Sequence, residues 1–188
     1  MKIKWLILSL ALLTGKIYAC EGVVENYVTS IHASVVQVLK SDKIIPGSSI
    51  FFYYAPGEKE HPDIKASFAP NRCAPGNNMV FDSFPYDGSV ASIDSVFFGK
   101  SWYSGKLFII VSWVYNMDGV NTVGKYYETF VYDYSKDKNR MMRNEEISSI
   151  FSGGHDGFFD GKPVKYKFKT AEDVWDHLNK LGSMAIKQ

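Results

Sequence analysis

Residues 152–160 come closest to a catalytic set, because Ser152, His155 and Asp156 occur there within a glycine-rich stretch. These residue types are those of a hydrolytic triad, but triad members approach one another from separate elements of a fold. The chain also lacks the G-x-S-x-G motif that places a nucleophilic serine on a sharp turn. A hydrolase that uses residues 152–160 is therefore an alternative hypothesis, and we expect no catalytic residue.

Metal and cofactor sites are not expected either. The four histidines have none of the paired spacings that bind zinc, and two cysteines are too few for a four-cysteine site. Asp156 and Asp160 can be imagined as a glycosidase carboxylate pair, but each precedes a glycine, which is ordinary turn chemistry. Neither glycine-rich phosphate-binding motif, G-x-G-x-x-G or G-x-x-x-x-G-K-[ST], is present, so we expect no nucleotide cofactor.

Aromatic residues are unusually frequent, with 13 Phe, 12 Tyr and 4 Trp. Some lie where no strand or helix periodicity explains them: Trp102 and Tyr103 have serine and glycine neighbours, and Phe158 and Phe159 lie between glycine turns. Rigid rings beside small polar residues are typical of protein-binding surfaces. The candidate partner-binding residues are Trp102, Tyr103, His155, Asp156, Phe158 and Phe159.

Length and charge restrict the class of protein. The chain has 188 residues with 21 basic and 20 acidic side chains, and 46% of its residues are hydrophobic. That length suits one domain with a sizeable core. A formal charge of +1 gives no positive field to hold a polyanion, so nucleic acid is not an expected partner.

The N-terminus is typical of a secretory signal peptide. Two lysines precede an apolar run over residues 5–13, and Ala19 supplies the small residue of a cleavage site. The run is too short for a membrane-spanning helix, which needs about 20 apolar residues. We expect residues 1–19 to be removed and residues 20–188 to form a single exported domain, periplasmic or secreted.

Cys20 would be the first residue of the exported chain, and two outcomes are open for it. Residues 17–20 resemble a degenerate bacterial lipobox, in which the cysteine is acylated and anchors the chain to a membrane, although Tyr18 departs from the small residue usual there. Alternatively, Cys20 pairs with Cys73, as an even cysteine count in an exported chain favours. We expect the disulfide, and contact with a membrane only if Cys20 carries a lipid.

Most of the exported chain has strand patterns. Residues 107–114 are apolar on both alternating faces, as in a central strand that is buried on both sides. Asp118-Gly119 then predicts a two-residue hairpin turn, with a return strand over 126–134. Other short runs rich in β-branched and aromatic residues predict strands at 49–55, 79–84 and 90–98.

Three further segments are less regular. Residues 23–40 fit both an amphipathic helix and an alternating strand, and we favour a strand broken near His32 because β-branched residues are frequent. Residues 56–77 contain four prolines and predict a long loop. The densely charged residues 135–146 predict a solvated turn.

One helix is expected at the C-terminal end. Thr170 can cap its first turn, and Gly182 is expected to end it. Before it, residues 163–169 alternate apolar side chains with lysines and predict a half-exposed edge strand. The apolar face of the helix consists of Val174, Trp175, Leu178 and Leu181.

The fold class that follows is mainly β (α+β): an antiparallel sheet, as a sandwich or a partly closed barrel, with one C-terminal helix packed on it. The expected function is that of an exported, non-catalytic protein-binding domain, for example an inhibitor or an immunity-type neutraliser of a toxin or envelope enzyme. The alternative is a carrier of small apolar ligands, which would enclose an aromatic-lined cavity of roughly several hundred cubic ångströms. A solid core with an exposed aromatic patch would instead favour protein binding.

Overall fold

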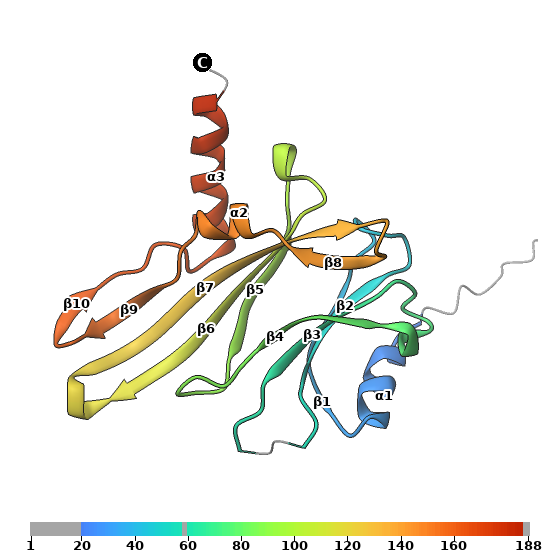
Figure 1. The fold of residues 1–188 in the computed structure, drawn as a ribbon, viewed down its shortest axis with the longest axis horizontal. Helices are drawn as coiled ribbons and strands as arrows, with labels where there is room; N and C mark the ends of the chain where they lie inside the picture. Colours follow the sequence, from blue (N-terminus) through green and yellow to red (C-terminus); the bar gives the residue numbers. More distant parts are fainter. Residues whose placement is uncertain (1–19, 58–59, 186–188) are drawn as a thin grey trace, which may run out of the picture.

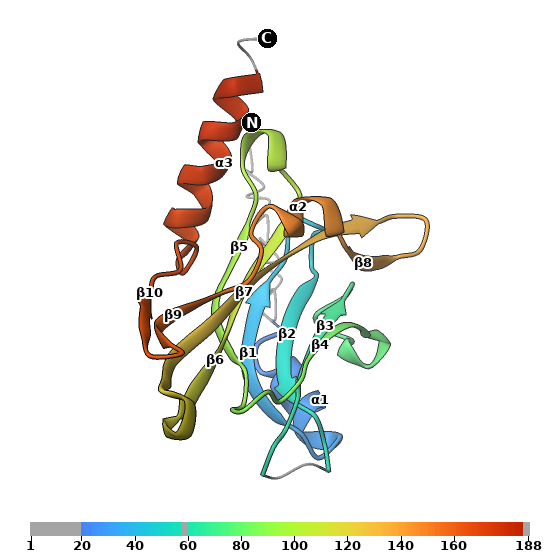
Figure 2. The same ribbon diagram turned by 60° about the vertical axis from the view of Figure 1, so that its left-hand side comes forward.

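The computed structural model describes residues 20–57 and 60–185, so the expected signal peptide at 1–19 lies outside the described residues. Two antiparallel sheets form the body of the molecule (Figure 1 and Figure 2). Sheet A is a meander of four strands that pair in sequence order. Its strands are β1 (Ser34–Lys40), β2 (Ser49–Tyr54), β3 (Ile64–Ala69) and β4 (Met79–Phe84).

Sheet B follows sheet A in the chain. Its strands lie in the order β10-β9-β7-β6-β5, and β8 pairs with the far end of β7. The long β6–β7 hairpin forms its centre, and the β9–β10 hairpin lies beside β7. The strands are β5 (Ser92–Phe98), β6 (Leu107–Met117), β7 (Thr122–Ser135), β8 (Arg140–Arg143), β9 (Gly154–Phe159) and β10 (Lys162–Val164).

Helices cover the outer faces of the two sheets. The first helix buries two valines on sheet A, and the last buries Val174 and Leu178 on sheet B. Among the described residues, no helix combines the length and the apolar character needed to cross a membrane. The helices are α1 (Val23–Ser30), α2 (Glu145–Ser149) and α3 (Ala171–Ala185), and the 3-10 turns are η1 (Pro75–Asn77), η2 (Ser101–Tyr103) and η3 (Asp118–Val120).

The central strands are buried on both faces, as the sequence predicted for residues 107–114. Along β6, odd-numbered residues from Leu107 to Trp113 lie in the apolar cluster between the sheets, whereas Phe108 and Ile110 lie in the cluster beneath α3. β2 alternates in the same way between sheet B and α1. The mainly β fold with a packed C-terminal helix is therefore confirmed, as two stacked sheets that do not close into a barrel.

The predicted start of the last helix is confirmed, but its predicted end is wrong. The Thr170 hydroxyl accepts a hydrogen bond from the Asp173 amide at 3.2 Å, and the Asp173 carboxylate accepts one from the Thr170 amide at 3.0 Å. α3 does not stop at Gly182 but continues to Ala185. A Cβ added at Gly182 would lie 3.7 Å from the Trp102 ring, so the helix passes close to the loop that carries this tryptophan.

The strand predicted over 23–40 is wrong for its first half. Residues 23–30 form α1, because Val24 and Val28 lie one helical turn apart and both are buried against sheet A. The strand preference holds for β1, and the break predicted near His32 coincides with a left-handed residue of φ 57°. Burial of Val24 and Val28 against sheet A outweighs the weak preference of β-branched residues for strands.

The long loop predicted over 56–77 contains β3, which lies inside sheet A between β2 and β4. Pro62 and Pro70 lie just outside its two ends, so neither removes a hydrogen bond from the ladder. Ala66 and Ser67 are fully buried within it. Because these residues are small, they weaken the apolar pattern from which a buried strand is recognised in a sequence.

Two predictions around the central hairpin also need correction. The turn at Asp118-Gly119 is not a two-residue turn, because Met117 and Thr122 form the last pair and four residues connect the strands. Within the charged segment 135–146, residues 140–143 form β8, and Met141 is buried in the cluster between the sheets.

The edge strand predicted over 163–169 is much shorter than expected. Only β10 pairs with β9, and the chain then leaves the sheet. Tyr166 and Phe168 are buried beneath α3, where the Tyr166 hydroxyl donates a hydrogen bond to the Phe151 carbonyl at 2.8 Å. The alternation of apolar residues and lysines therefore predicts correctly which side chains are buried, although residues 165–169 do not pair with another strand.

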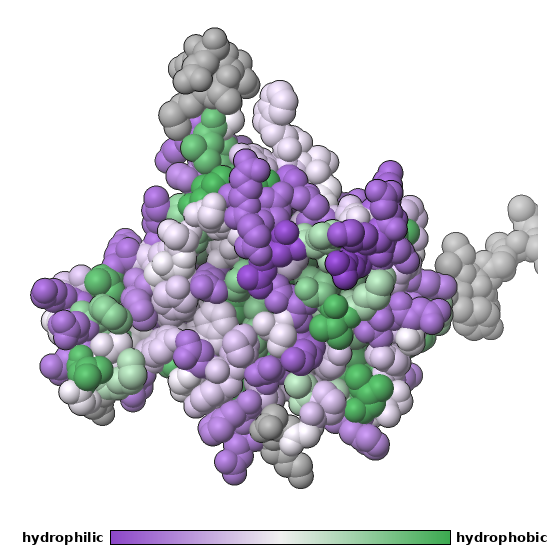
Figure 3. All heavy atoms as spheres, in the orientation of Figure 1, coloured by the Kyte–Doolittle hydropathy of each residue, from purple (hydrophilic) through white to green (hydrophobic). Residues whose placement is uncertain are grey.

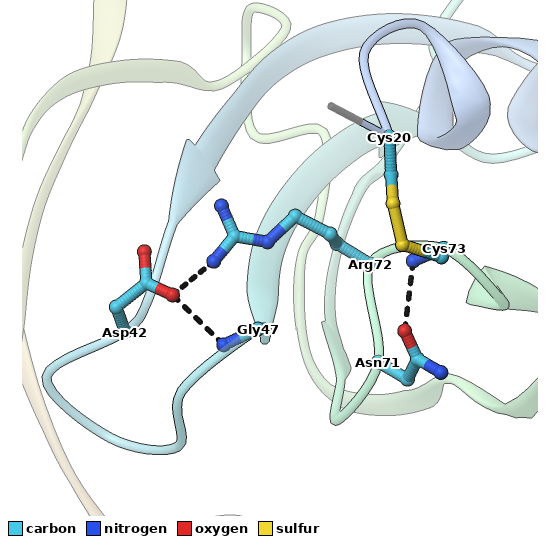
Figure 4. The surroundings of a disulfide bond; sticks show 6 residues. All are labelled: Cys20, Asp42, Gly47, Asn71, Arg72 and Cys73. Atoms are coloured by element: carbon cyan, nitrogen blue, oxygen red, sulfur yellow. Dashed lines mark hydrogen bonds and ion pairs between the residues drawn. A yellow bond between two sulfur atoms is a disulfide. The ribbon is translucent and has the colours of Figure 1, made fainter. Parts of the chain in front are cut away.

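A disulfide joins Cys20 to Cys73, as the sequence predicted, with their Cα atoms 5.1 Å apart (Figure 4). The loop around Cys73 has further ties. The Arg72 guanidinium pairs with Asp42, whose carboxylate also accepts the Gly47 amide at 2.8 Å. That backbone hydrogen bond and the Arg72 charge hold the pKa of Asp42 below its ordinary value. Cys20 is therefore fixed to sheet A.

Removal of the disulfide should lower the free energy of unfolding by up to about 4 kcal/mol, because the sequence separation of 53 closes a long loop. Urea unfolding of the double variant Cys20→Ser/Cys73→Ser, beside the unchanged protein, measures this difference. A reductant should lower the midpoint of the unchanged protein and leave that of the double variant where it is. A midpoint that the reductant does not move in the unchanged protein would contradict the prediction.

Candidate interaction surface and inter-sheet groove

The six candidate partner-binding residues do not form one surface. Trp102 and Tyr103 belong to η2, between β5 and β6, whereas the other four lie on β9. Successive residues of β9 face opposite sides of sheet B. His155 and Phe159 share one side, where their rings stack at 4.3 Å, and Asp156 lies on the other side.

The two η2 rings have different environments. Trp102 is 77% exposed, so it is not a core residue. Tyr103 is half-buried and makes an edge contact with the buried Phe108 ring at 6.4 Å. Of this pair, Trp102 alone offers its ring to a partner.

Asp156 and His155 are not arranged as a catalytic pair. The Asp156 carboxylate forms an ion pair with Lys169 at 2.9 Å and accepts the Tyr166 amide at 3.1 Å. The Lys169 hydrogen bond is the main reason that the pKa of Asp156 lies below its ordinary value. His155 instead packs against the Tyr126 ring at 4.9 Å on the opposite side of the sheet, and burial lowers its pKa. Asp156 therefore holds the chain leading to α3 and is not a free contact residue.

Exposed apolar side chains gather where the β6–β7 and β9–β10 hairpins end side by side. Phe158 is 56% exposed and Phe159 is 43% exposed. We name this group the apolar tip; Figure 3 shows apolar side chains at the corresponding end of the molecule, on the left of the view. Six of the nine exposed large apolar residues in the described chain belong to it. The apolar tip consists of Val114, Met117, Val120, Val123, Phe158 and Phe159.

Close approach of β7 and β9 holds the two hairpins together. Gly124 and Gly157 are paired in the ladder, and a Cβ on either would run into a backbone carbonyl of the other strand. Nearer the end, the Gly161 amide donates to the Asn121 carbonyl at 3.0 Å. The apolar tip therefore lies on two hairpins that are held together as a braced double hairpin, and its side chains are presented on both faces of the sheet.

A second feature is an open hollow of about 370 Å³ between the two sheets, which we name the inter-sheet groove. It combines aromatic rings with charged groups. The Trp113 indole donates to the Pro85 carbonyl at 2.8 Å and so ties β6 to the chain that leaves sheet A. The lining residues are Ser83, Phe84, Pro85, Tyr86, Asp87, Trp113, Tyr126, Glu128, Phe130 and Arg143.

Glu128 is a charged residue of the inter-sheet groove whose position the packing of the two sheets does not explain. It is half-buried and forms no ion pair with any described residue; its carboxylate accepts one hydrogen bond, from the Tyr126 hydroxyl at 3.3 Å. Burial raises the pKa of this carboxyl above its ordinary value of 4.5. The positive charge of Arg143 acts on this carboxyl, but the Arg143 guanidinium is bound to Asp82 at 2.6 Å.

A row of aromatic rings connects the groove to the apolar tip. Trp113 lies 6.4 Å from Tyr126, Tyr126 lies 4.9 Å from His155, and His155 stacks on Phe159. All of these rings lie on the side of sheet B that faces sheet A. One partner can therefore contact the groove and the tip together.

Sequence reasoning identified Phe158, Phe159 and Trp102 but missed the aliphatic part of the tip and the charged part of the groove. The signal for Glu128 was present, because it alternates with aromatic residues on one face of its strand. A carboxylate on an otherwise aromatic face is unusual. Arg143 gave no such signal, because it lies in a densely charged segment.

Compared with protein-family models, with curated protein sequences and with solved structures, the chain matches none of them.

Gly124→Ala should separate the two hairpins and lower the free energy of unfolding by about 2 kcal/mol, because φ is 149° there and the added Cβ meets the Asp156 carbonyl. Urea unfolding measures the loss, and amide exchange of β9 locates it. Gly119→Ala is the matched control in the turn of the same β6–β7 hairpin, since its Cβ would have no atom within 4 Å. Equal stability of the two variants would refute this role of Gly124.

Glu128→Gln should raise the stability of the protein at pH 7, because it removes a charge that burial disfavours. The folded pKa of Glu128 is raised, so its carboxylate destabilises the folded state above that pKa, and the penalty fades as the carboxyl becomes protonated. The gain over the unchanged protein should therefore shrink as pH falls and vanish below about 4.5, the ordinary carboxyl value. Asp87, Tyr126 and Arg143 face the same groove, Asp82 is bound to Arg143, and all four residues remain in both proteins. Thermal unfolding from pH 4 to pH 8 checks the trend; a pH-independent difference would contradict it.

Proposed function

We propose that the protein is an exported, non-catalytic domain that binds another protein, with the apolar tip as its main contact. The observation that carries this proposal is the concentration of exposed apolar side chains on one braced double hairpin. Apolar groups gathered on a surface mark sites of interaction. Aromatic residues held rigidly act as anchors, because little side-chain freedom is lost on binding.

Export is the part of the proposal that the disulfide supports. Disulfides persist in oxidising compartments such as the periplasm or the cell exterior. A disulfide to Cys73 and a lipid on the Cys20 sulfur exclude each other, so we favour a form without a lipid anchor. A signal peptide at residues 1–19 is consistent with that route.

Within protein-binding domains, we favour an inhibitor or an immunity-type neutraliser. Such proteins act by covering a site on their partner, and this needs a rigid projecting element but no reactive group. The two hairpins project beyond sheet A at one end of the molecule (Figure 1). A projecting apolar end fits insertion into a partner's cleft.

The two alternative functions have less support. A carrier of apolar ligands needs an enclosed apolar cavity, whereas the inter-sheet groove is open and contains Glu128 and Arg143. A hydrolase that uses residues 152–160 would need His155 and Asp156 to cooperate, but they lie on opposite sides of β9. Neither alternative accounts for the apolar tip.

Phe158→Ser should reduce capture of the partner at least about ten-fold, because loss of an aromatic anchor at the centre of an interface weakens binding by about 2 kcal/mol or more. The measurement is affinity capture by the tagged protein from an envelope extract of its own cells, with quantitative mass spectrometry. Val80→Ser is the matched control, since Val80 is also exposed, at 53%, but lies on sheet A. Trp102→Ala tests the exposed ring of η2 separately; it should weaken capture without lowering the melting temperature.

Equal capture by Phe158→Ser and by Val80→Ser would overturn the role of the tip. Turnover of a substrate by the purified protein would overturn the non-catalytic reading.

A further inference from the structure

The starting observation is a carboxylate inside an aromatic groove that forms no ion pair with any described residue. Glu128 lies between Tyr126 and Phe130 along the face of β7 that is turned toward sheet A. Removal of an ionised carboxylate from water is costly unless a cation or several hydrogen bonds compensate it. Among the described residues, Glu128 forms no ion pair and accepts one hydrogen bond, from the Tyr126 hydroxyl. Arg143, the cation that acts on it, is itself bound to Asp82.

The charges around Glu128 leave the groove negative. Arg143 is neutralised by Asp82, which also accepts a hydrogen bond from the Tyr132 hydroxyl. The Arg143 guanidinium lies over the Phe130 ring, with its central carbon 4.5 Å from the ring centroid, and this contact fixes it further. Asp87 accepts the Tyr115 hydroxyl at 2.5 Å and has no ion pair in the described chain. Asp87 and Glu128 therefore remain as negative charges without an ion pair among the described residues.

Aromatic rings complete the set of groups that bind a cation. Tyr86, Trp113 and Tyr126 line the groove beside the two carboxylates. The face of an aromatic ring attracts a cation, and the attraction grows when the cation leaves water. Carboxylates surrounded by rings are therefore suited to an ammonium or a guanidinium, whereas an anion would be repelled and an apolar group would leave Glu128 unpaired.

We propose that the inter-sheet groove receives a lysine or arginine side chain of the protein partner. This inference rests on the proposed function and adds the chemistry of the partner to it. The row of rings from Phe159 through His155 to Tyr126 joins the groove to the apolar tip. The partner surface therefore has a basic residue next to an apolar patch, and Glu128 is the specificity-determining contact.

Titration with N-acetyl-lysine methylamide, followed by the NMR signal of the Trp113 indole N–H, tests the proposal. This group lies in the groove and donates to the Pro85 carbonyl, so it reports occupancy there. We expect saturable binding in roughly the millimolar range for so small a probe. Binding should weaken at least ten-fold for N-acetyl-norleucine methylamide, which has the same chain length without the charge.

Glu128→Gln should weaken binding of the lysine probe at least ten-fold, since it removes the charge and keeps the shape. Glu172→Gln, an exposed carboxylate on α3, is the control and should bind as the unchanged protein does. Equal binding of the lysine and norleucine probes, or full affinity in Glu128→Gln, would overturn the cation site. Tighter binding of choline than of the lysine probe would overturn its assignment to a protein side chain.

The outcomes separate this inference from the proposed function. If Phe158→Ser abolishes partner capture while the lysine probe does not bind, the protein-binding function stands and the groove inference fails. If the probe binds and Glu128→Gln prevents it while Phe158→Ser captures normally, the groove inference stands and the tip is not the main contact.

Discussion

Burial of both faces of β6 is the interaction on which the rest of the structure depends. Its residues from Leu107 to Trp113 are all buried, alternately against sheet A and against α3. Each large apolar side chain that is fully buried contributes about 1.5–3 kcal/mol. Sheet B can pack on sheet A with one face and on α3 with the other only because β6 has apolar side chains on both of its faces.

The same strand explains where function can reside. From Val114 onward β6 emerges from between the layers, and its last four residues are exposed or half-buried. β7 pairs with this emerging end, and β9 continues the sheet beside it. Side chains there are not required by the core, so their apolar character needs another explanation, which the proposed contact with a partner would supply.

Sequence patterns were sufficient to predict an element wherever its buried residues recur with the regular spacing of a strand or a helix. The two-faced apolar run of β6, the capped C-terminal helix and the cysteine pair could all be predicted, because each rests on local spacing or on parity of count. β3 could not, because its small buried residues resemble a loop between prolines. α1 could not either, because the helical and strand patterns coincide over its valines, and the docking of those valines on β2 decides between them.

The candidate site could be predicted only in part. Phe158, Phe159 and Trp102 were recognisable as rings in turn-rich segments. The remainder of the apolar tip depends on strand register, which brings Val123 opposite Phe158 and cannot be read from either segment alone. The groove depends on the stacking of two sheets, so Asp87 and Glu128 come together from segments that are remote in the chain.

The order of the sheets along the chain has a consequence for biogenesis. All four strands of sheet A precede all six of sheet B, so the interface between the sheets joins early residues to late ones. The bond from Arg143 to Asp82 spans 61 positions. In a chain that emerges N-terminus first, sheet A can therefore form before sheet B. The inner face of sheet A, with Phe52 and Phe68, then stays exposed to water until the residues of sheet B follow. Until then that exposed apolar face favours self-association, so this topology gives a chaperone that covers the nascent chain a clear benefit.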